Sequence, residues 1–369
     1  MPFLFFMARC LLVRDDHTPG RAAFPVVDAH NHVWGGWDRL ADVVRVMDAC
    51  GVAVYADLTA NLNLRFEGGG YRFEPSDLSL FFERCATVAP GRFYCFTTAT
   101  FSVPWDRPLF TDALAFVTRT VEMLRDHAAR GARGLKILKE LGLRYRDGEG
   151  NLVRVDDPRL DPIWETCAEL GLPVLIHQSD PVGFFEPVTP DNEHFTTMLR
   201  YPDWSFADPH YPRKRELLER RDRLIARHPR TTFILPHVAN WPENLGYVSD
   251  LLDRFPNVYI DFSARLDELG RQPYRTRELF LRHQDRILFG TDMPANEAMY
   301  RTYFRFLETF DEFFAPPDYE GRIPENPRWF IYGIGLPRSV LARIYYRNAL
   351  RIIPGLRRQW AKQAFLRKP

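Results

Sequence analysis

Short apolar segments alternate with longer amphipathic segments along most of the chain. Eight runs rich in Val, Ile, Leu and Phe recur between residues 24 and 290, and apolar residues continue through each run. Continuous apolar runs are typical of strands that are buried on both faces of a parallel sheet. The predicted strands cover residues 24–33, 52–58, 92–98, 132–138, 172–177, 231–237, 257–262 and 286–290.

Helical spacing of apolar residues separates these runs. Segments with one apolar face begin near residue 38 and cover 112–130, 158–170 and 338–350, and the segment after the second strand is expected to be a glycine-containing loop. Eight strands that alternate with helices predict the α/β class and a closed (β/α)8, or TIM, barrel. An open doubly wound sheet is the alternative.

The pattern predicts one barrel domain over residues 24–355. Residues 1–23 are expected to be a poorly ordered leader, with a targeting role as the alternative, and residues 356–369 a C-terminal tail. Two connections, at about 178–212 and 295–336, are too long for plain turns. Both follow strand ends on the side where a barrel places its active site, so we expect lids or substrate walls, or else decoration of the rim.

Charge and cysteine content exclude several classes of protein. The chain has 49 basic and 48 acidic residues and a net charge of +1, which does not support nucleic-acid binding. It has no apolar run long enough to span a membrane. Its five cysteines include no CxxC pair, which favours reduced thiols in a cytoplasmic protein. A homo-oligomer is compatible with the sequence.

The end of the first predicted strand carries two histidines. His30 and His32 are two residues apart, so on an extended strand both would point to the same face, which Asp28 shares. Asn31 would point the other way, toward the helices. In a barrel the shared face is the interior, where two imidazoles can bind one metal ion.

Three more candidate residues stand at the ends of other strands. His177 ends the fifth strand, His237 ends the sixth, and Asp292 follows the eighth in the run LFGTD. A single buried histidine is usually a core residue, but imidazoles and a carboxylate on separate strand ends together favour a divalent metal site. Zinc is expected, and manganese, iron or cobalt would also fit these ligands. Such an ion lowers the pKa of a bound water toward neutrality.

Several motifs resemble the amidohydrolase superfamily. They are DAHNHV, GLKILK, VLIHQSD, ILPHVAN, LFGTD and YYRNALRI, and the resemblance extends over about residues 24–355. Within the superfamily the motifs are most similar to the amidohydrolase-related branch, which includes metal-dependent hydrolases and non-oxidative decarboxylases. The motifs are not specific for one reaction.

The resemblance implies a role for each candidate. His30, His32 and His177 would be metal ligands, and Asp292 would ligate the metal or act as base toward its water. His237 would lie beside the metal and polarise the substrate or position water in one-metal members, or ligate a second ion in two-metal members. One ion is expected rather than two.

Lys136, on the fourth predicted strand, has three possible roles under this resemblance. It would be a carboxylated bridge between two metals, a contact to the substrate or to a supporting carboxylate, or a structural residue. The contact role is the expected one.

Arg265 follows the seventh strand. It could clamp a substrate carboxylate, or form a surface ion pair with Asp267 or Glu268. Asp261 and Ser263 alternate on one face of the same strand end and are further candidates.

Three functions follow from these observations. The first is a metal-dependent hydrolase that cleaves a C–O or C–N bond of a lactone, ester or amide. The second is a metal-dependent non-oxidative decarboxylase, and the third is a non-catalytic ligand-binding barrel. The substrate is expected to be a small molecule, carboxylated or cyclic, with apolar walls from Trp34, Trp37, Phe184 and Phe185.

Overall fold

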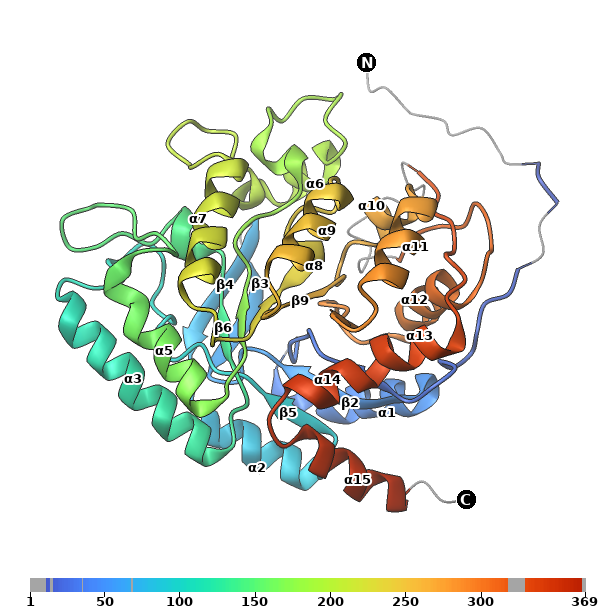
Figure 1. The fold of residues 1–369 in the computed structure, drawn as a ribbon, viewed down its shortest axis with the longest axis horizontal. Helices are drawn as coiled ribbons and strands as arrows, with labels where there is room; N and C mark the ends of the chain where they lie inside the picture. The colour runs from blue at the N-terminus through green and yellow to red at the C-terminus, as the bar shows by residue number, and fades with distance from the viewer. Residues whose placement is uncertain (1–10, 14–15, 35, 68, 318–328, 367–369) are drawn as a thin grey trace.

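A computed structural model describes residues 11–13, 16–34, 36–67, 69–317 and 329–366. In this part of the chain, eight parallel strands and the helices between them surround one axis (Figure 1). The strands are β1 (Val26–Asp28), β2 (Val52–Asp57), β5 (Phe93–Cys95), β6 (Leu135–Ile137), β7 (Val174–Ile176), β8 (Phe233–Leu235), β9 (Val258–Asp261) and β10 (Ile287–Leu288). Each corresponds to one of the eight predicted runs.

Backbone hydrogen bonds close these strands into a ring. One sheet has the order β1-β2-β5 and another the order β10-β9-β8-β7-β6. At one seam Thr97 pairs in parallel with Leu135, and the Lys136 N–H donates to the Thr97 carbonyl at 2.8 Å. At the other seam the Ala29 N–H donates to the Phe289 carbonyl at 2.9 Å. The predicted (β/α)8 barrel is therefore confirmed, and the open sheet is excluded.

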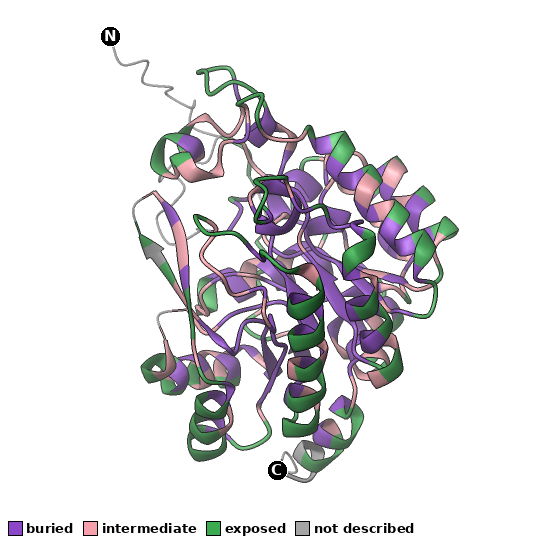
Figure 2. Cartoon of the chain, turned by 90° about the vertical axis from the view of Figure 1, so that its left-hand side faces the viewer, coloured by how far each residue is buried: buried purple, intermediate pink, exposed green. Residues whose placement is uncertain are grey.

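An outer layer of helices covers the strands, with its exposed side toward solvent (Figure 2). The longer helices are α1 (Leu40–Cys50), α2 (Leu78–Val88), α3 (Ala113–Arg130), α5 (Asp161–Leu170), α7 (Lys214–Arg227), α9 (Leu245–Arg254), α11 (Pro273–Arg282), α12 (Glu297–Glu308) and α15 (Leu356–Leu366). Shorter segments are α4 (Glu140–Leu143), α6 (Phe195–Arg200), α8 (Pro236–Ala239), α10 (Leu266–Gly270), α13 (Arg338–Ala342), α14 (Asn348–Ile352), a π-helical segment at Arg343–Arg347 and 3-10 turns at Trp37–Arg39, Pro158–Leu160, Val182–Phe185 and Pro202–Trp204.

Local sequence explains where the helices begin and end. Asp112 caps α3 by accepting from the Ala115 N–H at 3.0 Å, and Asn296 caps α12 by accepting from the Met299 N–H at 2.8 Å. α1 ends at Gly51, whose φ of 82° is a left-handed conformation that glycine adopts without strain.

The barrel interior is a separate apolar cluster. Val27, Ala53, Leu175, Ile234 and Leu288 belong to it, as do side chains of α14 and α15 that close its lower end. Burying this apolar surface stabilises the ring of strands from inside.

The face predicted for the first strand is wrong. Because Val27 packs in the barrel interior, Asp28 points outward, where its carboxylate accepts hydrogen bonds from Thr291 and Tyr300. β1 ends at Asp28, so strand alternation stops before the histidines. Asn31 donates to the same outward-pointing Asp28 carboxylate at 3.0 Å, on the side where α12 contributes Tyr300.

The expected loop after the second strand is also wrong. It is an antiparallel hairpin of β3 (Leu62–Glu67) and β4 (Gly70–Pro75), followed by α2. Its strands alternate apolar and polar residues, as a half-buried hairpin requires.

Described residues near both ends of the chain contact the rest of the molecule. In the predicted tail, α15 stacks Trp360 on Tyr346 with ring centroids 5.1 Å apart. Much of the predicted leader over 1–23 lies outside the described residues, as do 318–328 of the second long connection. Within the leader, His17 Nδ1 lies 2.7 Å from Asp311 Oδ1.

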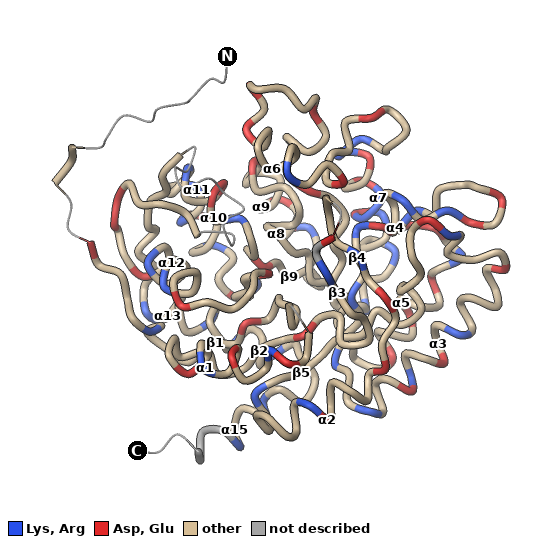
Figure 3. The backbone as a smooth tube through the Cα atoms, turned by 180° about the vertical axis from the view of Figure 1, so that it is seen from behind, with Lys and Arg blue, Asp and Glu red and all other residues tan. Residues whose placement is uncertain are grey.

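The distribution of charged residues and the state of the cysteines agree with what the sequence indicates. Basic and acidic residues are interspersed along the tube in Figure 3. No helix within the described ranges has the length and apolar character needed to cross a bilayer. Cys50, Cys85, Cys95 and Cys167 are buried free thiols, and Cys10 lies outside the described residues.

Candidate metal centre and its pocket

Three potential metal ligands meet above the barrel strands. His30 follows β1, His237 follows β8 and Asp292 follows β10. One nitrogen or oxygen atom from each lies within 4.8 Å of the others. Parallel strands bring their carboxyl ends to one side of a barrel, which explains why residues far apart in sequence meet here.

Three of the imidazoles are oriented by a hydrogen-bond contact at Nδ1. The contacts are His30 with Asp261 Oδ2 at 2.8 Å, His32 with Thr59 Oγ1 at 2.7 Å and His237 with the Ser263 carbonyl at 2.8 Å. A partner on Nδ1 leaves the Nε2 lone pair for a metal, which is the usual arrangement around metal-ligating histidines. Asp261 and Ser263, which the sequence offered as candidates, therefore support His30 and His237.

Asp292 lies between the three imidazoles. Its carboxylate oxygens are 3.4 Å from His32 Nε2, 3.5 Å from His30 Nε2 and 3.6 Å from His237 Nε2. Burial raises the pKa of Asp292 to about 7, with Lys136 opposing this shift and Asp261 adding to it. Its φ of 51° is left-handed, a strained conformation that is more frequent at functional sites.

The donor set fits a divalent cation. His237 Nε2 and Asp292 Oδ1 are buried and have no hydrogen-bond partner among the described residues. Burial lowers the pKa of His30, His32 and His237 well below the usual value, so these imidazoles are neutral, as metal ligands must be. Imidazole nitrogens with one carboxylate suit zinc and related transition metals.

His177 lies next to this group but faces a different partner. Its ring centroid is 4.5 Å from that of His237, while its Nε2 lies 3.3 Å from Asp180 Oδ1. Asp180 also forms a buried ion pair with Lys139. Burial lowers the pKa of His177 to about 4, with Asp180 opposing the shift.

Lys136 reaches the centre from the barrel interior. Its Nζ is 3.4 Å from His30 Nε2, and the residue is 1% exposed. Burial lowers the pKa of Lys136 to about 8, while Asp292 acts in the opposite direction. The ammonium is thus placed among the candidate ligands at the base of the pocket.

Arg265 lies in the pocket wall rather than on the surface, and its charge acts on both Asp267 and Glu268. Its side chain is 12% exposed and lines the pocket, with Nη2 3.9 Å from Asp180 Oδ1 and Nη1 donating to the Ala264 carbonyl at 2.6 Å. The arginine is drawn inward because it begins α10 on the pocket side.

An unusual turn presents His237. Four successive residues, His237 to Asn240, have φ between 53° and 61°, and none is glycine. Left-handed backbone costs about 1 kcal/mol or more for each such residue. Two buried cations of α7 hold the turn, because Arg221 donates to the Ala239 carbonyl at 2.7 Å and Lys214 donates to the Asn240 carbonyl.

The candidate centre opens into a pocket of about 190 Å³. The first long connection supplies one wall, as expected, and Trp34 and Phe184 contribute apolar surface. Trp37 instead lines a neighbouring hollow, and Phe185 packs in a separate cluster. The lining residues are His32, Trp34, Leu64, Tyr71, Lys136, Leu138, Lys139, His177, Asp180, Pro181, Phe184, His194, Thr197, Tyr201, Trp204, His237, Ala264, Arg265, Asp267, Glu268 and Asp292.

Sequence reasoning missed some supporting residues. Thr59 holds His32, yet a threonine after a strand carries no special signal. Lys214 and Arg221 lie on an ordinary amphipathic helix, and only their burial, at 7% and 0% exposed, distinguishes them from surface cations.

Comparison with family models identifies the family, and comparison with solved structures identifies the fold. Residues 27–355 match the family described as amidohydrolase, and no curated protein matches the chain. The 2,6-dihydroxybenzoate decarboxylase from Rhizobium is 17% identical with a TM-score of 0.53, covering 89% of this chain and 98% of that chain. A dihydroxybenzoic acid decarboxylase from Polaromonas sp. JS666, with bound manganese and the inhibitor 2-nitroresorcinol, is 16% identical with a TM-score of 0.51, covering 89% and 96%. A putative amidohydrolase from Staphylococcus aureus is 15% identical with a TM-score of 0.52, covering 89% and 99%.

Proposed function

The chain belongs to the amidohydrolase family, and from this premise we propose that it is a metal-dependent hydrolase of a small molecule. The family contains both metal-dependent hydrolases and decarboxylases. The observation that carries the proposal is the group of His30, His237 and Asp292 at the base of a pocket. The reaction would cleave a C–O or C–N bond of a lactone, ester or amide.

One divalent cation is proposed, with zinc first and manganese, iron or cobalt as alternatives. His30, His32, His177 and Asp292 would hold it, and His237 would remain beside it. A second arrangement, in which His237 takes the place of His177, is supported by the contact between His177 Nε2 and Asp180 and by the closeness of His237 to His30 and Asp292. When bound, the cation supplies a Lewis acid that activates water and polarises the scissile carbonyl.

Asp292 is the proposed proton carrier. In hydrolysis the oxygen of water bonds to the acyl carbon, the C–O or C–N bond breaks, and one proton passes from the water to the leaving group. A pKa of about 7 allows Asp292 to accept that proton and release it near neutral pH. His237, with Nδ1 held by the Ser263 carbonyl, would orient the carbonyl or the water through Nε2.

Lys136 and Arg265 are the proposed contacts to the substrate. Both carry donors on the pocket wall, which suits a carbonyl or carboxylate oxygen. Lys136 is close enough to His30 to act at the reacting end.

Non-oxidative decarboxylation is a second candidate, supported by the cations around the pocket base. Lys136 and Arg265 would bind the departing carboxylate, and the proton carried by Asp292 would replace carbon dioxide on the substrate carbon. Two of the solved structures similar to this chain are dihydroxybenzoate decarboxylases. A non-catalytic binding barrel would have no need for a buried carboxyl such as Asp292, whose pKa of about 7 suits proton transfer.

Labelled water separates these reactions. The zinc- or manganese-reconstituted protein would be incubated in H₂¹⁸O with dihydrocoumarin, phenyl acetate, benzamide and 2,6-dihydroxybenzoate. Hydrolysis places one ¹⁸O atom in the acid product, whereas decarboxylation releases carbon dioxide without labelling the organic product. Asp292→Asn should abolish turnover, and Asp285→Asn, at an exposed site paired with Arg343, should retain it. Carbon dioxide release alone would assign the decarboxylase, and metal binding without turnover would favour the binding barrel.

A further inference from the structure

The pocket wall formed by α10 carries two carboxylates that the proposed reaction does not use. Asp267 and Glu268 line the pocket and are only 9% and 4% exposed. Adjacent buried carboxylates are costly, because each loses hydration and each repels the other. Such a pair needs a compensating partner.

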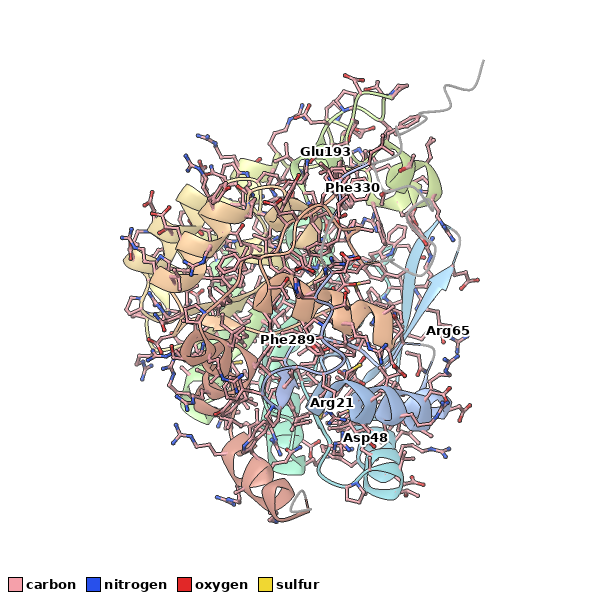
Figure 4. All side chains as sticks on the ribbon, turned by 90° about the vertical axis from the view of Figure 1, so that its right-hand side faces the viewer. Arg21, Asp48, Arg65, Glu193, Phe289 and Phe330 are labelled. Carbon is pink, nitrogen blue, oxygen red and sulfur yellow. The ribbon has the colours of Figure 1, made fainter. Side chains whose placement is uncertain are left out.

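Arg271, a basic residue next to the pair, already has other acceptors. Arg271 Nη1 donates to Glu193 Oε2 at 2.8 Å, and its guanidinium stacks on the Trp329 ring at 3.9 Å. Arg271 Nε donates to the backbone carbonyl of Asp267 at 3.1 Å and not to its carboxylate. Figure 4 labels Glu193 close to Phe330 in the upper part of the view.

The other facing cations offset the charge of the pair only in part. Arg265 and Arg271 act on both carboxylates, and His194 Nε2 lies 3.9 Å from Glu268 Oε1. Glu193 and Glu243 are further carboxylates nearby and add negative charge. Among the described residues, four carboxylates therefore face two guanidinium groups on this wall.

Two oxygens of the pair are left for a ligand. Asp267 Oδ1 and Glu268 Oε2 are buried, and neither has a hydrogen-bond partner in the described part of the chain. Burial, together with repulsion by Glu268, raises the pKa of Asp267, and burial raises the pKa of Glu268 against the effect of Arg265. Arg265 and Arg271 oppose both shifts without cancelling them.

The base of the same pocket has the opposite polarity. Lys136 lies there beside His30, where a metal ion would add further positive charge. A molecule that fills the pocket meets donors at this end and unpaired acceptors on the α10 wall.

Building on the proposed function, we propose that Asp267 and Glu268 bind a protonated amine of the substrate. The substrate class is then a small compound with a carbonyl or carboxyl group at the reacting end and an amine away from it. An ammonium has three donors, so it can satisfy both unpaired oxygens while neutralising the pair. A hydroxyl has one donor and leaves the charge in place.

Fragment binding tests this assignment without turnover. Benzylamine and benzyl alcohol would be titrated into the full-length, metal-reconstituted protein by calorimetry and by protein-observed NMR at about pH 8.5, where both carboxyls are mostly ionised and the amine is still mostly protonated. The protonated amine should bind at least about tenfold more tightly than the neutral alcohol, as expected for a charge-assisted pair in a buried site. Equal affinities, or no binding of benzylamine, would overturn the proposal.

Variants locate the binding. Asp267→Asn/Glu268→Gln should remove the preference for the amine while leaving binding of the alcohol unchanged. Glu169→Gln is the matched control, since this exposed glutamate pairs with Arg125 and does not line the pocket, and it should retain the preference. A preference that survives in the double variant would also overturn the assignment. Hydrolysis of neutral compounds with no preference for amines would refute this inference and leave the proposed function intact. A preference for amines without metal binding or turnover would refute the proposed function and leave this inference intact.

Discussion

At the scale of single residues, the candidate centre is built by partners that hold each imidazole. Asp261, Thr59 and the Ser263 carbonyl fix the Nδ1 atoms of His30, His32 and His237. Fixed tautomers lower the cost of assembling a metal site. These contacts do not decide whether His177 or His237 is the fourth ligand.

Single alanine substitutions distinguish the two histidines. We expect His177→Ala to weaken zinc binding by more than the roughly 10–100-fold loss that is usual for a supporting residue. His237→Ala should retain zinc and lose turnover. Competition with a chromophoric zinc chelator measures both affinities, and the reverse pattern would make His237 the ligand.

The acidic pair on α10 predicts a pH dependence of stability. Burial raises the pKa of Asp267 to about 8 and that of Glu268 to about 7, above the values near 4 of unfolded carboxyls. Because the folded state binds more protons between pH 4 and 8, these groups destabilise the protein as pH rises through that window. Asp267→Asn should therefore increase the free energy of unfolding at pH 8 by about 1–2 kcal/mol and change it little at pH 4.

Urea unfolding at pH 4, 5, 6, 7 and 8 measures this effect. Glu169→Gln serves as the control, since its exposed carboxylate is paired with Arg125. A variant with the same pH slope as the wild-type protein would show that Asp267 ionises normally in the fold.

At the scale of elements, the strands could be predicted and the irregular segments could not. Continuous apolar runs identify all eight barrel strands, because a strand that is buried on both faces needs apolar side chains at successive positions. The hairpin β3–β4 was missed because its alternation is short and interrupted by glycines. The sequence gives little warning of the turn at His237, since Val238 and Ala239 rarely adopt left-handed backbone and Asn240 alone is of a type enriched in it.

That turn is stable because tertiary contacts compensate for its strain. Lys214 donates to the carbonyls of Asp180 and Asn240 and so links the loop after His177 to the turn at His237. The candidate ligands after β7 and β8 therefore depend on one buried ammonium of α7.

Lys214→Met tests this dependence with little change in volume. The two carbonyls lose their donor, so the free energy of unfolding should fall by about 1–3 kcal/mol. Zinc affinity should fall as well, because His177 and His237 lose a common anchor. Arg215→Met, at the next and exposed position, should change neither quantity, and equal effects of the two substitutions would contradict the role of Lys214.

At the scale of the whole molecule, closing the barrel is what assembles the centre. The seam between β1 and β10 carries both His30 and Asp292, and the Asp292 N–H donates to the His30 carbonyl at 2.8 Å. The alternation of strands and helices predicts this closure, and the spacing of histidines at strand ends predicts which residues meet. The pocket walls could not be predicted, since long connections carry no periodic pattern.

Gly290→Ala should disturb the seam. A Cβ at this position would lie 2.7 Å from His30 Cβ and 3.2 Å from His30 N, so the strand carrying His30 must shift. We expect a loss of about 1–3 kcal/mol in the free energy of unfolding, together with weaker metal binding. Gly246→Ala in helix α9, where the new Cβ meets only Asn244 Oδ1 at 3.6 Å, should be neutral or slightly stabilising. Unchanged stability and metal affinity in Gly290→Ala would contradict the close packing at this seam.

The metal content of the full-length protein tests the central claim most directly. It would be measured by mass spectrometry of purified protein and again after reconstitution with zinc or manganese, beside a His30→Ala/Asp292→Ala variant. We predict about one equivalent per chain in the wild-type protein and none in the variant, as expected for ligands that form one closed site. A wild-type protein without bound metal after reconstitution would contradict the assignment of a metal-dependent enzyme.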